Sequence, residues 1–275
     1  MARVVEYLRT SELIQLGQPL AIGAPRFHGH PPFMYSLTSR HGEGPAVPGL
    51  DSRISGAADA FAMGIHTGTH MDSLSHIAVD GCLHDGTNVL ADGVQDHARG
   101  IRVDGGQAIR PILAPGVLLD FPAMLGVERV PETYDITPDL IDRCVEWAGD
   151  EIAPGDVVLV RTGWDTLWDD AAQYLSPEMP GPTPEAARYL VERGVVATGS
   201  DTMAYERAPG DKPLAVHAIL LVEGGVFIIE CLNLAELSRR RIHRFLFSAH
   251  PLQVTGATGS PINPVAIVPR APSSP

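Results

Sequence analysis

The middle of the chain alternates short apolar runs with amphipathic segments. The apolar runs at 116–121, 155–164 and 195–201 are short and rich in Val and Leu, which is typical of buried strands. Between them, residues 137–151 and 183–194 each begin with Thr-Pro and carry apolar residues at helical spacing. Threonine is a good N-cap and proline suits the first helical position. We therefore predict alternating strands and helices here.

The N-terminal quarter shows a different pattern. Residues 7–17 carry apolar positions at helical spacing, so we predict a helix that is capped by Thr10 or Ser11 and ends at Gly17. A long loop follows, up to about residue 56. Long loops in compact domains are often functional. Four side chains of this loop are candidate pocket residues, unless they only anchor the loop: Phe27, His28, Phe33 and Tyr35.

The C-terminal part, 213–268, is predicted to be mostly strand. Two apolar segments flank Gly224-Gly225, a short helix is expected at 233–240, and two further apolar runs close the chain. The whole pattern predicts a mixed α/β protein. We expect one domain over 1–275, in which 1–56 form the N-terminal helix and a long pocket-forming loop.

Composition and charge narrow the class of protein. The chain has 275 residues, of which 44% are hydrophobic, enough to bury a core without disulfides. Its three cysteines are widely spaced, which favours reduced thiols and a cytoplasmic protein. A net charge of −13 argues against a nucleic-acid partner. The basic run 239–244 is interpreted as cations at a helix end, and no apolar run has membrane-spanning length.

Candidate chemistry is concentrated in the stretch HTGTHMDSLSH, residues 66–76. On a helix, His66 and His70 would share a face while Asp72 pointed elsewhere, and Gly68 disfavours a helix. A strand end followed by a turn instead allows the three side chains to converge. Two imidazoles and one carboxylate commonly hold a catalytic divalent ion. The alternative, histidines that only cap turns, is disfavoured by the number of donors.

Further candidates lie far along the chain. A catalytic ion needs a neighbouring group that moves protons. His217 and Glu230 each stand alone in an apolar run, where a buried carboxylate is costly unless it is paired or binds metal. If these runs pair across Gly224-Gly225, both side chains face one cavity. Asp201 is interpreted as a helix N-cap rather than a functional residue. Ser260, in the turn sequence GATGSP, is a further pocket candidate.

Residues 66–76 resemble the signature H-x-G-T-H-x-D-x-P-x-H of the cyclase-like metal-dependent hydrolases, a family that includes bacterial kynurenine formamidase, isatin hydrolase and a trans-dienelactone hydrolase. Leu74 stands where the signature has proline. The resemblance continues through VLVRTGW, ATGSDTMAYE, VHAILLVEGGVFIIECLNL and VTGATGSPINPVAIV. It covers most of the chain from about residue 60. It implies a swivelling β/β/α fold around a central mixed, barrel-like sheet.

The resemblance also implies roles for individual residues. Its implied metal ligands are His66, His70, Asp72, His217 and Glu230. His76 matches either the general acid/base or a ligand of a second ion, and His217 and Glu230 are further catalytic candidates. The implied cofactor is one or two divalent ions, zinc or manganese. The implied assembly is a homodimer or homotetramer whose pockets include residues of a neighbour.

These features predict an enzyme. Its expected reaction is hydrolysis of an amide or lactone bond in a small cyclic or aromatic substrate through a metal-activated water. Two enzymatic alternatives are an arylformamidase acting on N-formylkynurenine and a cyclase or lyase without net hydrolysis. A non-catalytic metal-binding protein is disfavoured, because structural zinc sites are usually rich in thiolates and only Cys82 lies near the histidines.

Overall fold

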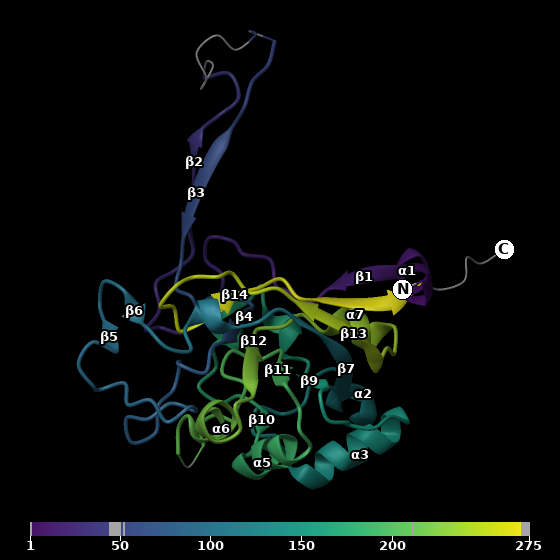
Figure 1. Ribbon diagram of the computed structural model, residues 1–275. Helices are drawn as coiled ribbons and strands as arrows, with labels where there is room; N and C mark the ends of the chain where they lie inside the picture. The colour runs from purple at the N-terminus through teal and green to yellow at the C-terminus, as the bar shows by residue number, and fades with distance from the viewer. Residues whose placement is uncertain (1, 44–50, 52, 211, 271–275) are drawn as a thin grey trace, which may run out of the picture.

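One curled, mixed sheet organises the molecule (Figure 1). The computed structural model describes residues 2–43, 51, 53–210 and 212–270. The sheet contains, in spatial order, β1 (Ser11–Gln15), β15 (Val265–Pro269), β13 (Arg244–Ala249), β7 (Ile112–Asp120), β9 (Val157–Arg161), β11 (Ala197–Ser200), β12 (Phe227–Glu230), β4 (His70–Asp72) and β14 (Gly259–Pro261). The four central strands β7, β9, β11 and β12 are parallel, and antiparallel strands extend the sheet on both sides.

The predicted alternation in the middle of the chain is confirmed. Helices α3 (Pro138–Ala148) and α5 (Pro184–Glu192) connect the central strands. Thr137 and Thr183 cap them, because each hydroxyl accepts a hydrogen bond from the backbone N–H three residues later. The local Thr-Pro signal therefore agrees with the tertiary fold.

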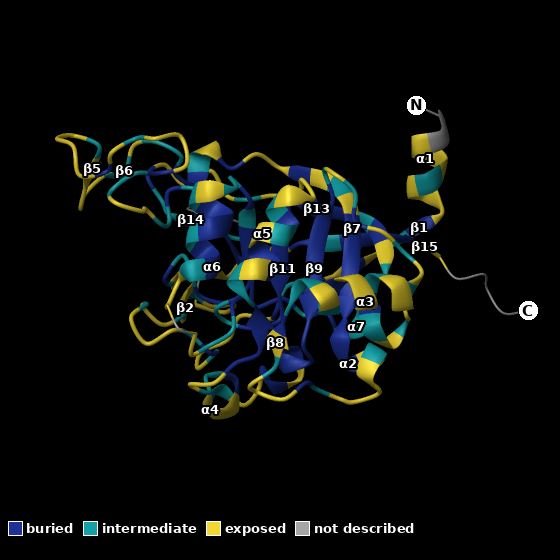
Figure 2. Ribbon diagram, turned by 90° about the horizontal axis from the view of Figure 1, so that it is seen from below, coloured by how far each residue is buried: buried dark blue, intermediate teal, exposed yellow. Residues whose placement is uncertain are grey.

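Helices cover one face of the sheet (Figure 2). Alternate strand residues point to opposite faces. Val158 and Val160 pack toward the helices, whereas Leu159 packs on the other side. The helical face also includes α2 (Phe121–Leu125), α6 (Ala215–His217) and η3 (Ala218–Glu223). The second core cluster comes mainly from the strands themselves, with Leu237 of α7 (Ala235–Arg239), as expected for a sheet that curls like a half-barrel.

Shorter elements complete the fold. They are η1 (Gly106–Ala108), η2 (Trp164–Leu167), α4 (Ala171–Tyr174), and two strand pairs, β5 (Gln95–Asp96) with β6 (Gly100–Ile101) and β8 (Asp135–Ile136) with β10 (Gly181–Pro182). Among the described residues, no helix has the length and apolar character that a membrane span requires.

The helix predicted for residues 7–17 is wrong. The structure has a helix α1 at Ala2–Arg9 and a strand β1 at Ser11–Gln15. Thr10 bonds back to the carbonyl of Glu6 at the end of the helix, so it does not begin one. Pairing of β1 with β15 at the edge of the sheet overrides the local helical spacing.

The strand predicted around His217 is also wrong. Residues 215–223 form α6 and η3, and only Phe227–Glu230 of this region is a strand. A short, continuous apolar run fits a buried helix as well as a buried strand, so periodicity does not separate the two. The helix at 233–240 and the two closing strands are confirmed as α7, β13 and β15.

The N-terminal loop contributes one strand of a two-stranded arm that the sequence did not predict. Strand β2 (Met34–Ser39) pairs with β3 (Ala58–Ala62), and this two-stranded arm projects from the body (Figure 1). All of β3 and nearly all of β2 are exposed. Residues 44–50 and 52 of the predicted pocket-forming loop lie outside the described residues.

Candidate metal centre

Two adjacent strands place three polar side chains on one face of the sheet. In β4, His70 and Asp72 are two residues apart and so point the same way, while Met71 between them packs into the opposite core cluster. Glu230 of β12 lies directly across from His70 in the antiparallel register. The Nε2 atom of His70 is 3.4 Å from Oδ1 of Asp72 and 3.4 Å from Oε2 of Glu230.

A tight turn before β4 brings His66 to the same place. Gly68 has φ +69, a left-handed conformation that favours glycine. The Nδ1 atom of His66 is 2.7 Å from Oδ1 of Asp72. Its Nε2 bonds to Thr258 at 2.8 Å, which ties the turn to the C-terminal loop.

His217 reaches the cluster from the helical layer. Its Nε2 is 3.2 Å from Oε1 of Glu230 and 3.8 Å from Oδ2 of Asp72. The sequence prediction that His217 and Glu230 face one cavity depended on a hairpin. The two side chains do meet, but through a helix that packs against the strand.

We call the following six side chains the histidine cluster: His66, His70, Asp72, His76, His217 and Glu230. Within it, two groups of donors each fit around one point: His66, Asp72 and His76, and Asp72, His217 and Glu230. Asp72 belongs to both groups. The chain can therefore hold one ion, or two ions that share this carboxylate.

Unpaired polar atoms support a metal site at this place. Among the described residues, six buried side-chain N or O atoms form no hydrogen bond, and four of them belong to His66, His70 and Asp72. Buried polar atoms are normally paired. Nitrogen and carboxylate oxygen donors that lie close to one another but form no hydrogen bond suit a divalent cation, so these residues fit the ion that the sequence predicts.

The charges of the cluster also suit a cation. Burial alone would lower the pKa of His70, but the neighbouring Asp72 and Glu230 raise it to about 8. Burial likewise opposes a proton on His217, but Glu206 and Glu230 raise its pKa to about 10. A cation that takes the place of these protons releases them, so metal binding is expected to weaken as the pH falls.

His76 differs from the other histidines of the cluster. It follows β4 by four residues, is only half-buried, and lies with its ring centroid 4.1 Å from that of His66. Burial lowers the pKa of His76 to about 4. Its imidazole is therefore neutral near pH 7.

The predicted pocket residues of the N-terminal loop fall into two places. Phe27 and His28 contact each other, and Phe27 also lies against His30. Phe33 and Tyr35 instead belong to the base of the arm, where Phe33 lies near the ring of Phe61. His30 therefore joins this part of the loop to His66, whereas the arm projects from the body of the molecule (Figure 1).

Ser260 is not available as a pocket residue. It has no exposed surface, and its hydroxyl oxygen accepts a hydrogen bond from the backbone N–H of Leu252 and donates one to the carbonyl of Pro261. Ser260 also pairs with Met71, which points away from the cluster. The turn predicted for GATGSP covers only its start at Gly256, because Gly259–Pro261 form strand β14.

Asp201 does not cap a helix that begins after it. Its buried carboxylate accepts hydrogen bonds from the N–H groups of Thr162 and Gly163 and from the Thr162 hydroxyl. It thereby fixes the loop that precedes η2 at the carboxyl end of β9. The predicted capping chemistry is present, but it acts on a distant segment.

Two residues near the cluster were missed from the sequence as site residues. His30 lies with its ring centroid 5.3 Å from that of His66, and its Nδ1 is 3.4 Å from the His66 carbonyl. Glu206 contacts the outer nitrogen of His217 at 3.0 Å. Nothing in the local pattern around Glu206 indicates burial, because its contact with His217 depends on the fold.

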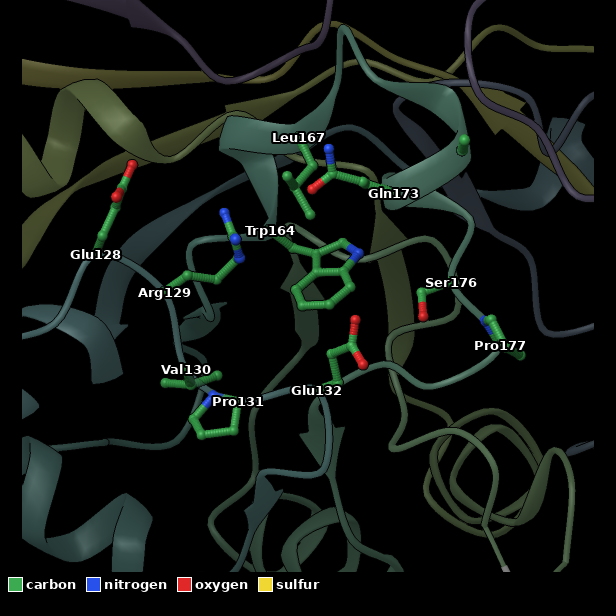
Figure 3. A pocket seen from close by; sticks show the side chains of 11 residues that line it. Glu128, Arg129, Val130, Pro131, Glu132, Trp164, Leu167, Gln173, Ser176 and Pro177 are labelled. Carbon is green, nitrogen blue, oxygen red and sulfur yellow. The ribbon is translucent and has the colours of Figure 1, made fainter.

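A separate cavity of about 600 Å³ lies beside η2 (Figure 3). Trp164 forms its floor, and the Arg129 guanidinium lies 6.0 Å from the centre of that ring. Its lining residues include no member of the histidine cluster. The cavity therefore lacks the donors on which the expected chemistry depends.

Comparisons with known proteins identify the family of this chain. The Cyclase family model matches residues 14–207. Isatin hydrolase from Roseibium aggregatum is 29% identical over 219 residues, which are 77% of this chain and 74% of that protein. The chain therefore belongs to the cyclase-like metal-dependent hydrolase family, as the signature predicted. It is accordingly an enzyme of that family.

Solved structures show the same fold. A crystal structure described as a novel cyclase superposes with a TM-score of 0.84 at 28% identity, over 97% of this chain and 90% of the other. Isatin hydrolase A from Labrenzia aggregata, bound to benzyl benzoate, superposes with a TM-score of 0.75 at 25% identity, over 98% and 99% of the two chains. The predicted mixed, barrel-like fold class is confirmed.

Proposed function

We propose that this enzyme hydrolyses an amide or lactone bond in a small cyclic or aromatic substrate, using one or two divalent ions held by the histidine cluster. Zinc and manganese both suit its nitrogen and oxygen donors. The observation that carries this proposal is the convergence of four buried, unpaired donor atoms of His66, His70 and Asp72. The named relative acts on isatin, a fused cyclic amide, which favours a substrate of that kind.

The residues of the cluster have different roles in this reaction. A bound ion supplies Lewis acidity and lowers the pKa of a water from ~16 toward ~7. The neutral His76 imidazole, which is half-buried beside His66, accepts the proton of the attacking water and returns it to the leaving nitrogen or oxygen. Phe27, which contacts His28 and His30, lies close to His66 through His30, so these rings are candidate contacts for an aromatic substrate.

A substrate panel tests the proposal. Purified protein loaded with Mn²⁺ or Zn²⁺ is assayed with isatin, a cyclic imide, a lactone and an N-formylaniline. Ring opening of isatin or the lactone is expected to be fastest. A clear preference for the formylaniline would favour the arylformamidase alternative, and release of products without net uptake of water would favour the lyase.

We further propose that the active assembly is a homodimer or homotetramer in which the arm packs on a second copy. A free two-stranded ribbon is marginally stable in water. One face of this arm carries Phe33, Tyr35, Leu37 and Phe61, of which the last three are exposed by 43%, 48% and 62%. An exposed aromatic face of this kind is typical of an interaction surface.

Light scattering coupled to size-exclusion chromatography measures this assembly. Wild-type protein is expected at two or four times the mass of one chain, because the apolar arm face is covered by a partner. The double variant Tyr35→Ser, Phe61→Ser is expected to shift toward one chain, while Ser36→Ala on the opposite face of β2 leaves the mass unchanged. Wild-type protein at the mass of one chain would contradict the proposal.

A further inference from the structure

A buried carboxylate stands behind the histidine cluster. Glu206 is only 7% exposed and lies in the segment between β11 and α6. Its Oε1 accepts a hydrogen bond from the backbone N–H of Leu214 at 2.6 Å. Its Oε2 accepts from the N–H groups of Val216 and His217 at 3.0 and 3.1 Å. These contacts compensate much of the cost of burying its charge.

The same carboxylate contacts the ring of His217. Oε2 of Glu206 lies 3.0 Å from Nδ1 of His217. The opposite nitrogen, Nε2, lies 3.2 Å from Glu230 and 3.8 Å from Asp72. The ring is therefore held between a carboxylate on its outer side and the candidate metal ligands on its inner side.

We infer that Glu206 is a positioning residue for metal binding, which acts by fixing the ring of His217. When the protonated Nδ1 donates a hydrogen bond to Glu206, Nε2 keeps its lone pair, which is directed at the donor group of Asp72 and Glu230. This inference rests on the proposed function, because it requires an ion at the cluster.

The backbone at the start of α6 needs a hydrogen-bond acceptor from elsewhere in the chain. Leu214, which precedes α6, has φ +60 and offers no side-chain cap to the helix. The first N–H groups of a helix have no partner within it, and Glu206 accepts two of those near this end. Because one carboxylate holds both the backbone of residues 214–217 and the ring of His217, the ligand cannot rotate independently of its helix.

Metal affinity tests the inference without an activity assay. Metal-stripped protein is titrated calorimetrically with Mn²⁺ alone. Glu206→Gln, which keeps the shape but loses the charge, is expected to bind about 10–100-fold more weakly than wild type, as second-sphere substitutions usually do. Glu223→Gln, at the exposed end of η3, is the matched control and is expected to bind like wild type. If Glu206→Gln does not fold, Glu206→Asp is used, with a loss of about tenfold expected.

A double-mutant cycle separates positioning from simple helix capping. In a His217→Ala background, Glu206→Gln is expected to cause no further loss of Mn²⁺ affinity. If Glu206→Gln lowers the Tm of the metal-free protein but binds Mn²⁺ normally, the inference is wrong while the proposed function stands. An equal loss of Mn²⁺ affinity in the wild-type and His217→Ala backgrounds would lead to the same conclusion. Wild-type protein that takes up no Mn²⁺ or Zn²⁺ would overturn the proposed function and this inference with it.

Discussion

Replacing His70 by alanine is expected to abolish metal retention and turnover together. The Nε2 atom of this buried side chain lies 3.4 Å from Asp72, which both donor groups share, and 3.4 Å from Glu230 of the second group. Loss of a residue that only supports a metal ligand already weakens metal binding about 10–100-fold. Loss of a ligand itself is therefore expected to weaken metal binding more than this. Metal content by mass spectrometry and the initial rate are measured on the same preparation.

The control for this variant is His97→Ala. His97 is exposed and does not belong to the cluster, so metal content and rate are expected to remain at the wild-type level. Full metal content in His70→Ala protein would show that the ligand assignment is wrong, even if turnover were lost.

His76→Ala is expected to keep the metal but to lose turnover by about 10²–10⁴-fold, the usual contribution of a general acid/base. His76 is less buried than His70 and carries a neutral imidazole near pH 7, because burial lowers its pKa to about 4. Parallel measurements of bound metal and rate distinguish the two effects.

The outcome for His76 also decides its role. The His66, Asp72 and His76 donors lie close enough to hold an ion, so both roles that the sequence leaves open are compatible with the geometry. Loss of one metal equivalent in His76→Ala would make His76 a ligand of a second ion. The proton carrier would then have to be another group.

Local signals predicted the parts of the fold where local and tertiary preferences agree. Thr137 and Thr183 cap the helices that the sequence indicated, because capping depends only on residues within one turn. The strand Ser11–Gln15 was mistaken for helix because its structure depends on pairing with β15, some 250 residues away in sequence. The helix that carries His217 was mistaken for strand because an apolar run has no period.

For the site as well, the sequence predicted what depends on neighbouring residues and missed what depends on the tertiary fold. His66, His70 and Asp72 were found because they stand within seven positions, and the structure brings them together. Glu206 was not found, since its partner His217 is eleven residues away across an irregular segment. Ser260 was wrongly included, because a turn sequence does not show which way its hydroxyl points.

The central claim is that the histidine cluster uses a metal ion to add water to an acyl bond. Its most direct test is isotope incorporation by the wild-type enzyme in ¹⁸O-labelled water, with metal-stripped and Mn²⁺-restored protein compared on the best substrate of the panel. One labelled oxygen is expected in the product, formed at an appreciable rate only after metal is restored. Unlabelled product, or labelled product formed equally fast by the stripped protein, would contradict the claim.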